Sequence, residues 1–405
     1  MNFTIIGNGV AGNTAALALS RLVPGARIDL YAAEAHPYYP RPLLPEFLAG
    51  ELDLEHLYFK PLSWYAGRNI ALHLGVPVAA IIPQEHRITL ADGTKAGYDR
   101  LLLAAGAQAW VPPIRGADKP GVFTLRTVDD ALAIRSYARQ ARRAIVIGGG
   151  LLGLEAARAL RVLGLQVRVV EFLPRLLPRQ LDAEGAAVLQ GLIEGRGIEI
   201  MLDVAAEEVL EADGVRGLRL KDGREMEGEL VLVSTGIRSN VALARQADLE
   251  VSHGVVVDEH LRTSAADVYA AGDVAEFDGR VYGIVPAAIE QARVAAAHMA
   301  GDESATYQGT VPFTTLKVTG IDLTSVGVIM PEEGREAEYQ ELRRTDGAQG
   351  LYRKLVLKDG RIVGAILLGD KARVGPVTQL INQPVDVSAH VERLLDDDFD
   401  LKSLL

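Results

Sequence analysis

The sequence of 405 residues contains no cysteine. Without a thiol, the chain cannot form a redox-active disulfide, a thiolate zinc site or a cysteine-held iron–sulfur cluster. Its eight histidines show no ligand spacing such as H-E-x-x-H, and we predict no metal site. The absence of cysteine therefore excludes the commonest redox groups that a protein builds from its own side chains.

Positive charge and long apolar runs are also scarce. The chain has 42 Lys and Arg against 53 Asp and Glu, and its net charge of −11 argues against nucleic acid as the main partner. No apolar run is long enough to span a bilayer, so we expect no membrane association. The first apolar segment follows Met1 almost directly, which leaves no room for a signal peptide, and we expect a cytoplasmic protein.

What the chain does contain is a strand–turn–helix–strand pattern at its centre, over residues 142–171. An apolar strand at Ala144–Ile147 leads into a glycine motif and then a helical pattern. A second apolar strand, Val167–Val170, ends at Glu171. The glycines of the motif are Gly148, Gly150 and Gly153. This is the full context of a dinucleotide-binding unit, which a bare glycine triplet would not provide.

Each feature of that unit has a physical role in holding a dinucleotide. The first glycine permits a tight turn, the second lets the backbone approach a pyrophosphate, and the third lets helix and strand pack closely. The free N–H groups at the helix start face the phosphates. Glu171 is placed to accept both hydroxyls of a ribose, and it would repel a 2′-phosphate. The pattern therefore favours NAD(H) over NADP(H).

The same pattern occurs a second time, at residues 3–34, with Gly7, Gly9, Gly12 and a closing Glu34. Each copy is followed by a hairpin with an Asp-Gly turn and then by an apolar strand, so the duplication extends to whole domains. Two such units indicate two nucleotide cofactors, or a duplicated half that has lost its ligand. A chain of this length is expected to form two or three domains.

Three further segments bear on function. Residues 36–50 carry four prolines, which we expect to prevent a regular helix, and Arg41 lies in this segment beside the first unit. A short strand ends at Asp273, and a helix begins at Pro286. From about residue 310 the pattern changes to strands and a short helix, as in a separate α+β domain.

The chain resembles the two-dinucleotide flavoprotein reductases. The segments YYPRPLLPEFLAG, RLLPRQLDAEGA, STGIRSN, TSAADVYAAGD and TTLKVTGIDLTSVG are similar to those of NADH:rubredoxin oxidoreductases and of the flavin-binding part of NADH-dependent nitrite reductases. The resemblance implies an α/β fold with two Rossmann-like dinucleotide-binding domains and a C-terminal α+β interface domain. It places a discontinuous FAD domain at 1–112 and 240–309, an inserted NAD domain at 113–239 and the interface domain at 310–405.

The resemblance also implies roles for individual residues. Glu155 and Lys317 would act beside the flavin, with Glu155 also near the nicotinamide, and Asp273 and Val285 would contact the ribityl chain and flavin O2. The other residues expected to bind FAD are Gly7, Gly9, Val10, Ala11, Gly12, Glu34, Arg41, Val78, Ala105 and Arg126. The other residues expected to bind NADH are Gly148, Gly150, Leu152, Gly153, Glu171 and Gly236. Related ferredoxin reductases often have Lys at the position of Glu46, which leaves the partner of Glu155 open.

The implied activity is transfer of hydride from NADH to FAD and of electrons to a small redox protein, such as rubredoxin or an acidic iron–sulfur protein. The basic residues of 343–373 form either a docking surface for such a carrier or an ordinary solvated face. Alternatives are an NADH oxidase that reduces O2, the flavin subunit of a nitrite reductase system, and a flavin-containing nucleotide sensor. We expect a monomer or a homodimer.

Overall fold

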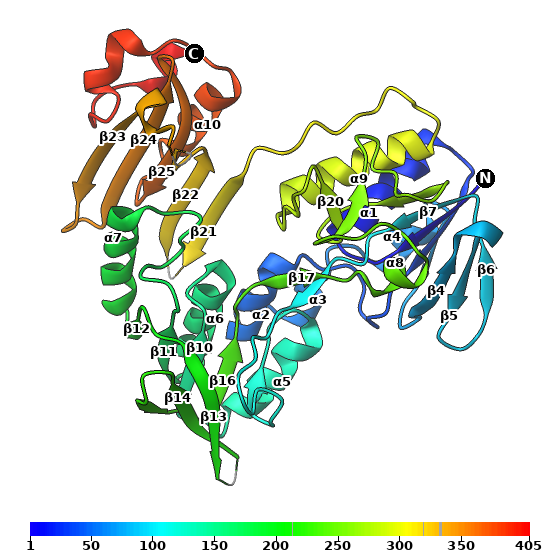
Figure 1. The fold of residues 1–405 in the computed structure, drawn as a ribbon, viewed down its shortest axis with the longest axis horizontal. Coiled ribbons are helices and arrows are strands. Elements are labelled where there is room, and N and C mark those ends of the chain that lie inside the picture. Colours follow the sequence, from blue (N-terminus) through cyan, green and yellow to red (C-terminus); the bar gives the residue numbers. More distant parts are fainter. Residues whose placement is uncertain (213, 319, 332–333) are drawn as a thin grey trace.

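The computed structural model describes residues 1–212, 214–318, 320–331 and 334–405, and only the backbone of 314–318. Figure 1 shows three groups of elements: one around β1 and α1, one around β10 and α6, and a C-terminal group that stands apart from the first and meets the second. Within the described ranges, no helix is both long and apolar enough to cross a membrane.

The first group is a five-stranded parallel sheet in the order β19-β7-β1-β2-β3. Its strands are mostly buried and apolar, as expected for a sheet covered on both faces. Helix α1 (Val10–Leu22) packs against α9 (Val285–Met299) through alanines that allow the two helices to approach closely. The strands are β1 (Asn2–Ile6), β2 (Arg27–Tyr31), β3 (Ile70–His73), β7 (Arg100–Leu103) and β19 (Val268–Ala270).

The second group repeats this architecture in the order β12-β11-β10-β16-β9, again all parallel. The strands are β9 (Val122–Phe123), β10 (Arg143–Ile147), β11 (Gln166–Val170), β12 (Ile198–Met201) and β16 (Leu230–Val233). Its helices are α5 (Val128–Ala138), α6 (Leu151–Val162) and α7 (Ala183–Glu194). In both groups the glycine motif follows the strand that lies third in the order, β1 or β10.

Each parallel sheet is accompanied by a small antiparallel one, as the two Asp-Gly turns predict. The first consists of β4 (Val78–Ile82), β5 (Arg87–Leu90) and β6 (Lys95–Gly97), and the second of β13 (Ala206–Ala212), β14 (Gly214–Leu220) and β15 (Glu225–Glu227). The chain passes between the two groups through β8 (Ala107–Ala109) and β17 (Ile237–Ser239), which pair with each other antiparallel. The remaining pair is β18 (Val255–Val257) with β20 (Ala275–Phe277).

The C-terminal group is an antiparallel sheet in the order β21-β22-β25-β24-β23. It comprises β21 (Phe313–Val318), β22 (Ile321–Gly327), β23 (Tyr339–Asp346), β24 (Leu351–Lys358) and β25 (Arg361–Leu368), with α10 (Val374–Asn382) against it. Its contact with the second group includes a buried ammonium: Lys354 is 1% exposed and lies 3.2 Å from Asp182 and 2.8 Å from Glu341. Asp182 also caps α7.

We predicted that residues 36–50 form no regular helix, and this is wrong for the second half of the segment. Helix α2 (Leu44–Ala49) follows a 3-10 turn η1 (Arg41–Leu43), and Pro45 lies in its first turn, where a missing N–H costs nothing. Phe47 and Leu48 are buried in one hydrophobic core with α5 and α6, so this segment packs on the second sheet.

The other short helices are α3 (Leu54–Leu57), α4 (Leu62–Ala66), α8 (Ala242–Gln246), η2 (Pro83–Glu85), η3 (Glu336–Glu338), η4 (Ser388–Arg393) and η5 (Leu401–Leu404). The hairpin at Asp92-Gly93 forms as predicted, and a further Asp-Gly turn, Asp359-Gly360, joins β24 to β25.

Candidate functional site

The first glycine motif connects β1 to α1. Gly7 has φ +116°, and a Cβ on it would lie 2.1 Å from the Ala104 carbonyl oxygen. A Cβ on Gly12 would lie 1.9 Å from the Gly7 oxygen, whereas one on Gly9 would meet nothing within 4 Å. No side chain caps α1, so the N–H groups of its first turn, including those of Val10 and Ala11, point out of the helix unpaired. An open cradle with free N–H groups fits a pyrophosphate.

The second motif has the same geometry at the start of α6. Gly148 has φ +114°, and a Cβ on it would lie 2.2 Å from the Ser234 oxygen. A Cβ on Gly153 would lie 2.1 Å from the Gly148 oxygen, whereas the position of Gly150 is open. Helix α6 also begins without a side-chain cap. The second unit therefore keeps the features that a dinucleotide needs, which favours two ligands over a unit that has lost its own.

The acid of the first unit is held by side chains from the proline-rich segment. Glu34 accepts a hydrogen bond from the Tyr39 hydroxyl and pairs with Arg41 at 3.0 Å. Arg41 also donates to the Arg126 carbonyl oxygen at 2.7 Å. Burial raises the pKa of Tyr39, and its bond to Glu34 raises it further, so the phenol stays protonated. Tyr39 was not predicted as a site residue, although an aromatic pair directly follows the first unit.

Arg126 connects the first unit to the second. Its Nη2 donates to Asp273 Oδ2 at 2.8 Å and its Nε to the Ala107 carbonyl oxygen at 3.0 Å. Burial lowers the pKa of Arg126 and Arg41 adds to this effect, while Asp273 opposes it. A Cβ on the adjacent Gly272 would lie 3.0 Å from the Ala11 Cβ, so Asp273 follows a residue that touches the first unit. Its contact with the ribityl chain stays a prediction.

The acid of the second unit is held by the backbone. Glu171 is 9% exposed and accepts hydrogen bonds from the N–H of Gly149 at 2.6 Å and of Leu173 at 2.8 Å. It lies beside the glycine turn, as the sequence predicted. Its carboxylate is therefore fixed in orientation before a ribose binds.

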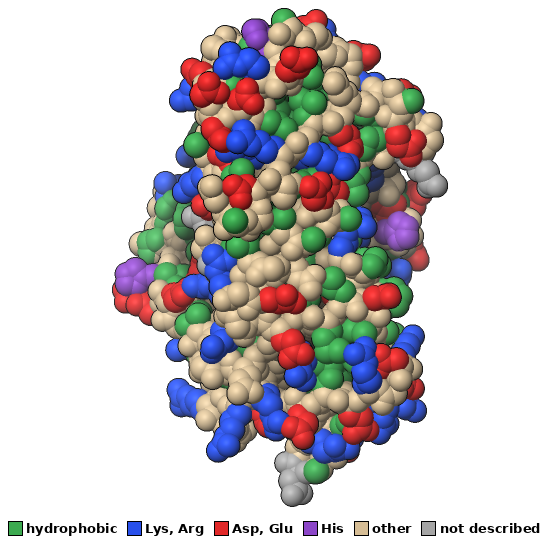
Figure 2. Space-filling model, turned by 90° about the vertical axis from the view of Figure 1, so that its left-hand side faces the viewer, with side chains coloured by type: hydrophobic (Ala, Val, Ile, Leu, Met, Phe, Trp, Pro, Cys, Tyr) green, Lys and Arg blue, Asp and Glu red, His purple; other side chains and the backbone are tan. Residues whose placement is uncertain are grey.

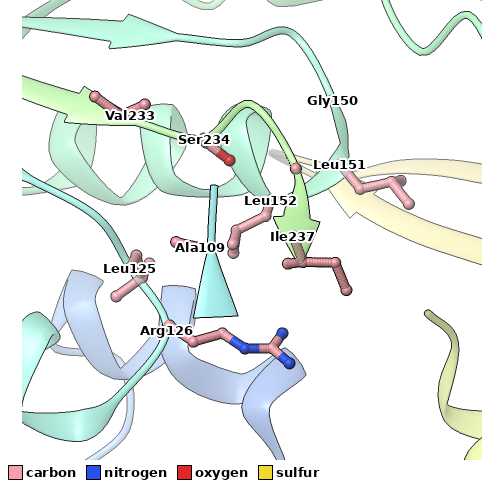
Figure 3. A pocket seen from close by; sticks show the side chains of 10 residues that line it. Ala109, Leu125, Arg126, Gly150, Leu151, Leu152, Val233, Ser234 and Ile237 are labelled. Atoms are coloured by element: carbon pink, nitrogen blue, oxygen red, sulfur yellow. The ribbon is translucent and has the colours of Figure 1, made fainter. Parts of the chain in front are cut away.

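A cavity of about 150 Å³ lies between the second motif and Arg126. In Figure 3 the side chains of Leu152, Ile237 and Arg126 border one space beside Ala109. The remaining lining residues are Leu125, Gly150, Leu151, Val233, Ser234 and Gly236. Arg126, which lines this cavity, also contacts Asp273, so the cavity borders a contact between the second group and the end of β19 in the first.

Glu155 lies one turn further along α6 than the leucines that line this cavity. Its pKa is raised to about 7, chiefly by burial and then by the nearby Glu46 carboxylate, with Arg158 opposing. Arg158 itself donates to both oxygens of Glu51. The charge on α2 that acts on Glu155 is therefore that of another acid, Glu46.

The other predicted site residues are placed as follows. Val78 begins β4, Ala105 follows β7 and accepts a hydrogen bond at its carbonyl from Asn240, and Gly236 lines the cavity. Val285 is the first residue of α9 and not the residue before it, so its N–H is still free of intrahelical bonds. Lys317 lies in β21, and its side chain is outside the described residues.

The predicted basic bias of residues 343–373 is largely neutralised inside the C-terminal group. Six of its eight basic residues are ion-paired, in the pairs Arg343–Glu341, Arg344–Asp397, Arg353–Asp370, Lys354–Glu341, Lys358–Glu338 and Arg373–Asp370. Most of these acids come from outside the segment, from 338–341 and from the tail. Figure 2 shows basic and acidic side chains interspersed over this face. The segment therefore offers little free positive charge for docking.

Comparison with known proteins agrees with this geometry. Residues 1–299 match the family model of pyridine nucleotide-disulphide oxidoreductases. The chain belongs to this family. Residues 312–385 match the rubredoxin NAD+ reductase C-terminal domain. The family and the fold class predicted from the sequence are confirmed, and because the chain lacks cysteine, it has no disulphide of its own to reduce.

Individual relatives make the similarity more specific. The chain is 37% identical over 389 residues to the nitrite reductase [NAD(P)H] of Bacillus subtilis, covering 95% of this chain and 47% of that protein. It is 31% identical over 366 residues to the NADH-rubredoxin oxidoreductase of Clostridium acetobutylicum, covering 90% of each. The reductase in the covalent putidaredoxin reductase–putidaredoxin complex superposes with a TM-score of 0.88, at 28% identity, over 100% of this chain and 97% of that chain. The chain thus spans about half the length of the nitrite reductases that it matches.

Proposed function

We propose that this chain is an FAD-dependent oxidoreductase that takes hydride from NADH and passes electrons to a small redox protein such as rubredoxin. The observation that supports this most is the presence of two intact dinucleotide units, with a cavity between the second motif and Arg126. When bound, FAD supplies the acceptance of hydride and the delivery of electrons. The residues of the chain supply binding, orientation and charge.

The first unit is the proposed FAD site. The free N–H groups at the start of α1 would hold the pyrophosphate, and Glu34, held by Tyr39 and Arg41, would bind the ribose. The remaining contacts predicted for FAD stand as proposals: Val78, Ala105, Arg126, Asp273, Val285 and Lys317. The start of α9 would stabilise negative charge on the flavin through its N–H groups.

The second unit is the proposed NADH site. Gly150 leaves space for the pyrophosphate, and the fixed carboxylate of Glu171 would accept the ribose hydroxyls. The nicotinamide would lie in the cavity beside Leu152, Gly236 and Arg126. We retain the predicted division into an FAD domain (1–112 and 240–309), an NAD domain (113–239) and an interface domain (310–405).

An anaerobic titration with NADH tests this function. The purified protein, reconstituted with FAD, should lose its yellow colour within seconds, and the reduced protein should then be offered rubredoxin, ferredoxin, O2 and quinones in turn. Fast reoxidation by rubredoxin alone supports the proposed acceptor. Fast reoxidation by O2 would make the protein an NADH oxidase, and a protein that binds no FAD would contradict the function itself.

A second candidate is the electron-input part of a nitrite reductase system, and the 37% identity to the Bacillus subtilis nitrite reductase favours it. Such a system needs a separate domain or chain for nitrite, because the described residues contain no group of His, Asp and Glu that could hold a metal ion. Transfer of electrons from the NADH-reduced chain to a nitrite-reducing partner, in preference to rubredoxin, would support this candidate.

A further inference from the structure

Two exposed apolar side chains lie where α3 leads into α4, in the first group. Phe59 is 66% exposed and Leu62 is 58% exposed, although large apolar side chains are usually buried. The Phe59 ring meets the Tyr38 ring edge to face, with their centroids 6.0 Å apart and their planes at 85°. Phe59 and Leu62 therefore present an apolar centre to solvent.

Two cations lie over the aromatic rings beside this centre. The Lys60 ammonium nitrogen is 3.9 Å from the centroid of the Trp64 ring and 5.7 Å from that of the Tyr38 ring. The Arg68 guanidinium carbon is 4.3 Å from the centroid of the Trp64 ring, and Arg68 also donates a hydrogen bond to the Trp64 carbonyl oxygen at 3.0 Å. These contacts hold both positive charges next to the exposed apolar side chains.

No ion pair neutralises these two charges within the part of the chain that the structure describes. The pKa of Lys60 is lowered to about 8, chiefly by burial and then by the positive charges of Arg68 and Arg21. Two of the acids in residues 51–68 are engaged with other partners, in the pairs Glu51–Arg158 and Asp53–His56. The third acid, Glu55, is exposed on α3. Positive charge therefore predominates around Lys60.

Trp64 connects these side chains to the first glycine motif. Its ring lies against the edge of the buried Tyr65 ring, with the centroids 5.0 Å apart. The Tyr65 hydroxyl donates to Asn13 Oδ1 at 2.7 Å, and Asn13 Nδ2 donates to the Gly9 carbonyl oxygen at 3.2 Å. The exposed side chains therefore belong to the outer surface of the proposed FAD site.

The α3–α4 patch comprises Phe59, Lys60, Leu62, Trp64 and Arg68. Exposed apolar surface with aromatic and arginine side chains is typical of protein interfaces, and cations without partners attract an acidic one. The basic residues of 343–373, in contrast, are largely paired. An anionic membrane would face a molecule of net charge −11, whereas a small protein responds mainly to the charges within about 10 Å of it.

We propose that the α3–α4 patch is the docking surface for the acidic electron-carrier protein of the proposed function. The inference rests on that function, because the protein acceptor is what would occupy the patch. The patch lies on the group proposed to hold FAD, so a carrier bound there meets the flavin-bearing part of the molecule. Phe59 would pack on the carrier, while Lys60 and Arg68 would face its carboxylates.

Steady-state reduction of rubredoxin by NADH tests this proposal, with ferredoxin as the acceptor if rubredoxin takes no electrons. Lys60→Glu and Arg68→Glu should each raise the KM for the carrier about tenfold at low salt, because they replace attraction by repulsion. The kcat should stay nearly the same. The rise in KM should shrink as salt is added, and Lys60→Arg should keep the KM of the unchanged protein.

Lys221→Glu is the matched control. It changes the net charge by the same amount, at an exposed turn of the second group, and should leave the carrier KM unchanged. Phe59→Ser removes an exposed ring without altering charge, and should raise the carrier KM about fivefold. In all of these variants the rate of flavin reduction by NADH, and the turnover of the neutral quinone menadione, should stay the same.

An unchanged carrier KM in Lys60→Glu and Phe59→Ser, or an equal rise in Lys221→Glu, overturns the docking surface and leaves the proposed function intact. An equal loss of menadione turnover also overturns it, because the patch would then act on the flavin site. Binding to phosphatidylglycerol vesicles that Lys60→Glu abolishes, with no change in the carrier KM, would assign the patch to a membrane. An NADH-reduced protein that neither rubredoxin nor ferredoxin reoxidises overturns the proposed acceptor, and the docking surface with it.

Discussion

The two nucleotide-binding units share one backbone plan but hold their acids differently. Glu34 is held by the side chains of Tyr39 and Arg41, and its side chain is 29% exposed. Glu171 is 9% exposed and is held by two backbone N–H groups of its own unit. The first site therefore depends on a segment that packs on the neighbouring sheet, whereas the second is complete within itself.

This difference teaches that the first nucleotide site and the position of the second sheet are coupled. Arg41 bonds to the backbone of Arg126, and Arg126 bonds to Asp273. A substitution of Glu34 should therefore alter contacts in both groups, through Arg41 and Arg126. A substitution of Glu171 should alter contacts only within the second unit. The following variants test this contrast, beginning with the largest expected effect.

The glycines separate folding from binding in both units. Gly12→Ala and Gly153→Ala each place a Cβ about 2 Å from a backbone oxygen, and we expect a loss of about 3 kcal/mol or more in unfolding free energy. Gly9→Ala and Gly150→Ala add a methyl group into open space, and should leave the melting temperature unchanged.

We expect the Gly9 and Gly150 variants to affect different ligands, one for each unit. Gly9→Ala should lose FAD, and Gly150→Ala should keep FAD but bind NADH poorly, as read from flavin absorbance and an anaerobic NADH titration. Equal loss of both ligands in both variants would contradict the assignment of one nucleotide to each unit.

The two motif helices differ at several positions, and at one of them α1 has Thr14 where α6 has Glu155. Because the folded-state pKa of Glu155 is raised from 4.5 to about 7, the folded protein binds more protons than the unfolded chain between these values. Stability should therefore fall as pH rises from about 4.5 to 7. Glu155→Gln should remove this loss and raise the unfolding free energy by about 3 kcal/mol at pH 8, with no gain at pH 4. Urea denaturation at pH 8 and pH 4 measures this change in unfolding free energy. An equal increase at both pH values would show that the charge of Glu155 is not the cause.

Replacing the backbone-held acid should change nucleotide preference without disturbing FAD. Glu171→Arg removes two charge-assisted hydrogen bonds and introduces a cation, so the KM for NADH should rise about tenfold and that for NADPH should fall. Steady-state kinetics with both nucleotides measure this, and unchanged constants would mean that Glu171 is not at the ribose.

The smallest expected effect is on the side-chain-held acid. Tyr39→Phe removes one hydrogen bond to Glu34 and should weaken FAD binding by about 1 kcal/mol, or about fivefold. The KM for NADH should stay the same. Fluorescence titration of the apoprotein with FAD measures this change. A larger effect on NADH than on FAD would reverse the proposed order of the sites.

Much of this fold could be predicted from the sequence because its signals are local. Glycine spacing, apolar strands and Asp-Gly turns each act over a few residues. Together they predict both parallel sheets and the hairpin that follows each glycine motif. The same holds for Gly7, Gly148 and the acids that close each unit. These residues act through the backbone next to them.

What could not be predicted depends on contacts between distant segments. Helix α2 forms because its apolar face meets α6 in another part of the chain, although Pro45 reads locally as a helix breaker. Counting charges along 343–373 missed acids that fold back onto them, such as Glu341 and Asp397. The packing of α2, which carries Glu46, against α6, which carries Glu155, likewise joins segments more than one hundred residues apart.

The paired strands β8 and β17 have one more consequence. The chain leaves the first nucleotide-binding group along one of them and returns along the other, and the two are hydrogen-bonded side by side. The two segments that connect the nucleotide-binding groups therefore form one two-stranded ribbon and not two separate linkers. A rotation of one group against the other has one shared pivot, and any opening that admits a dinucleotide must bend that ribbon as a unit.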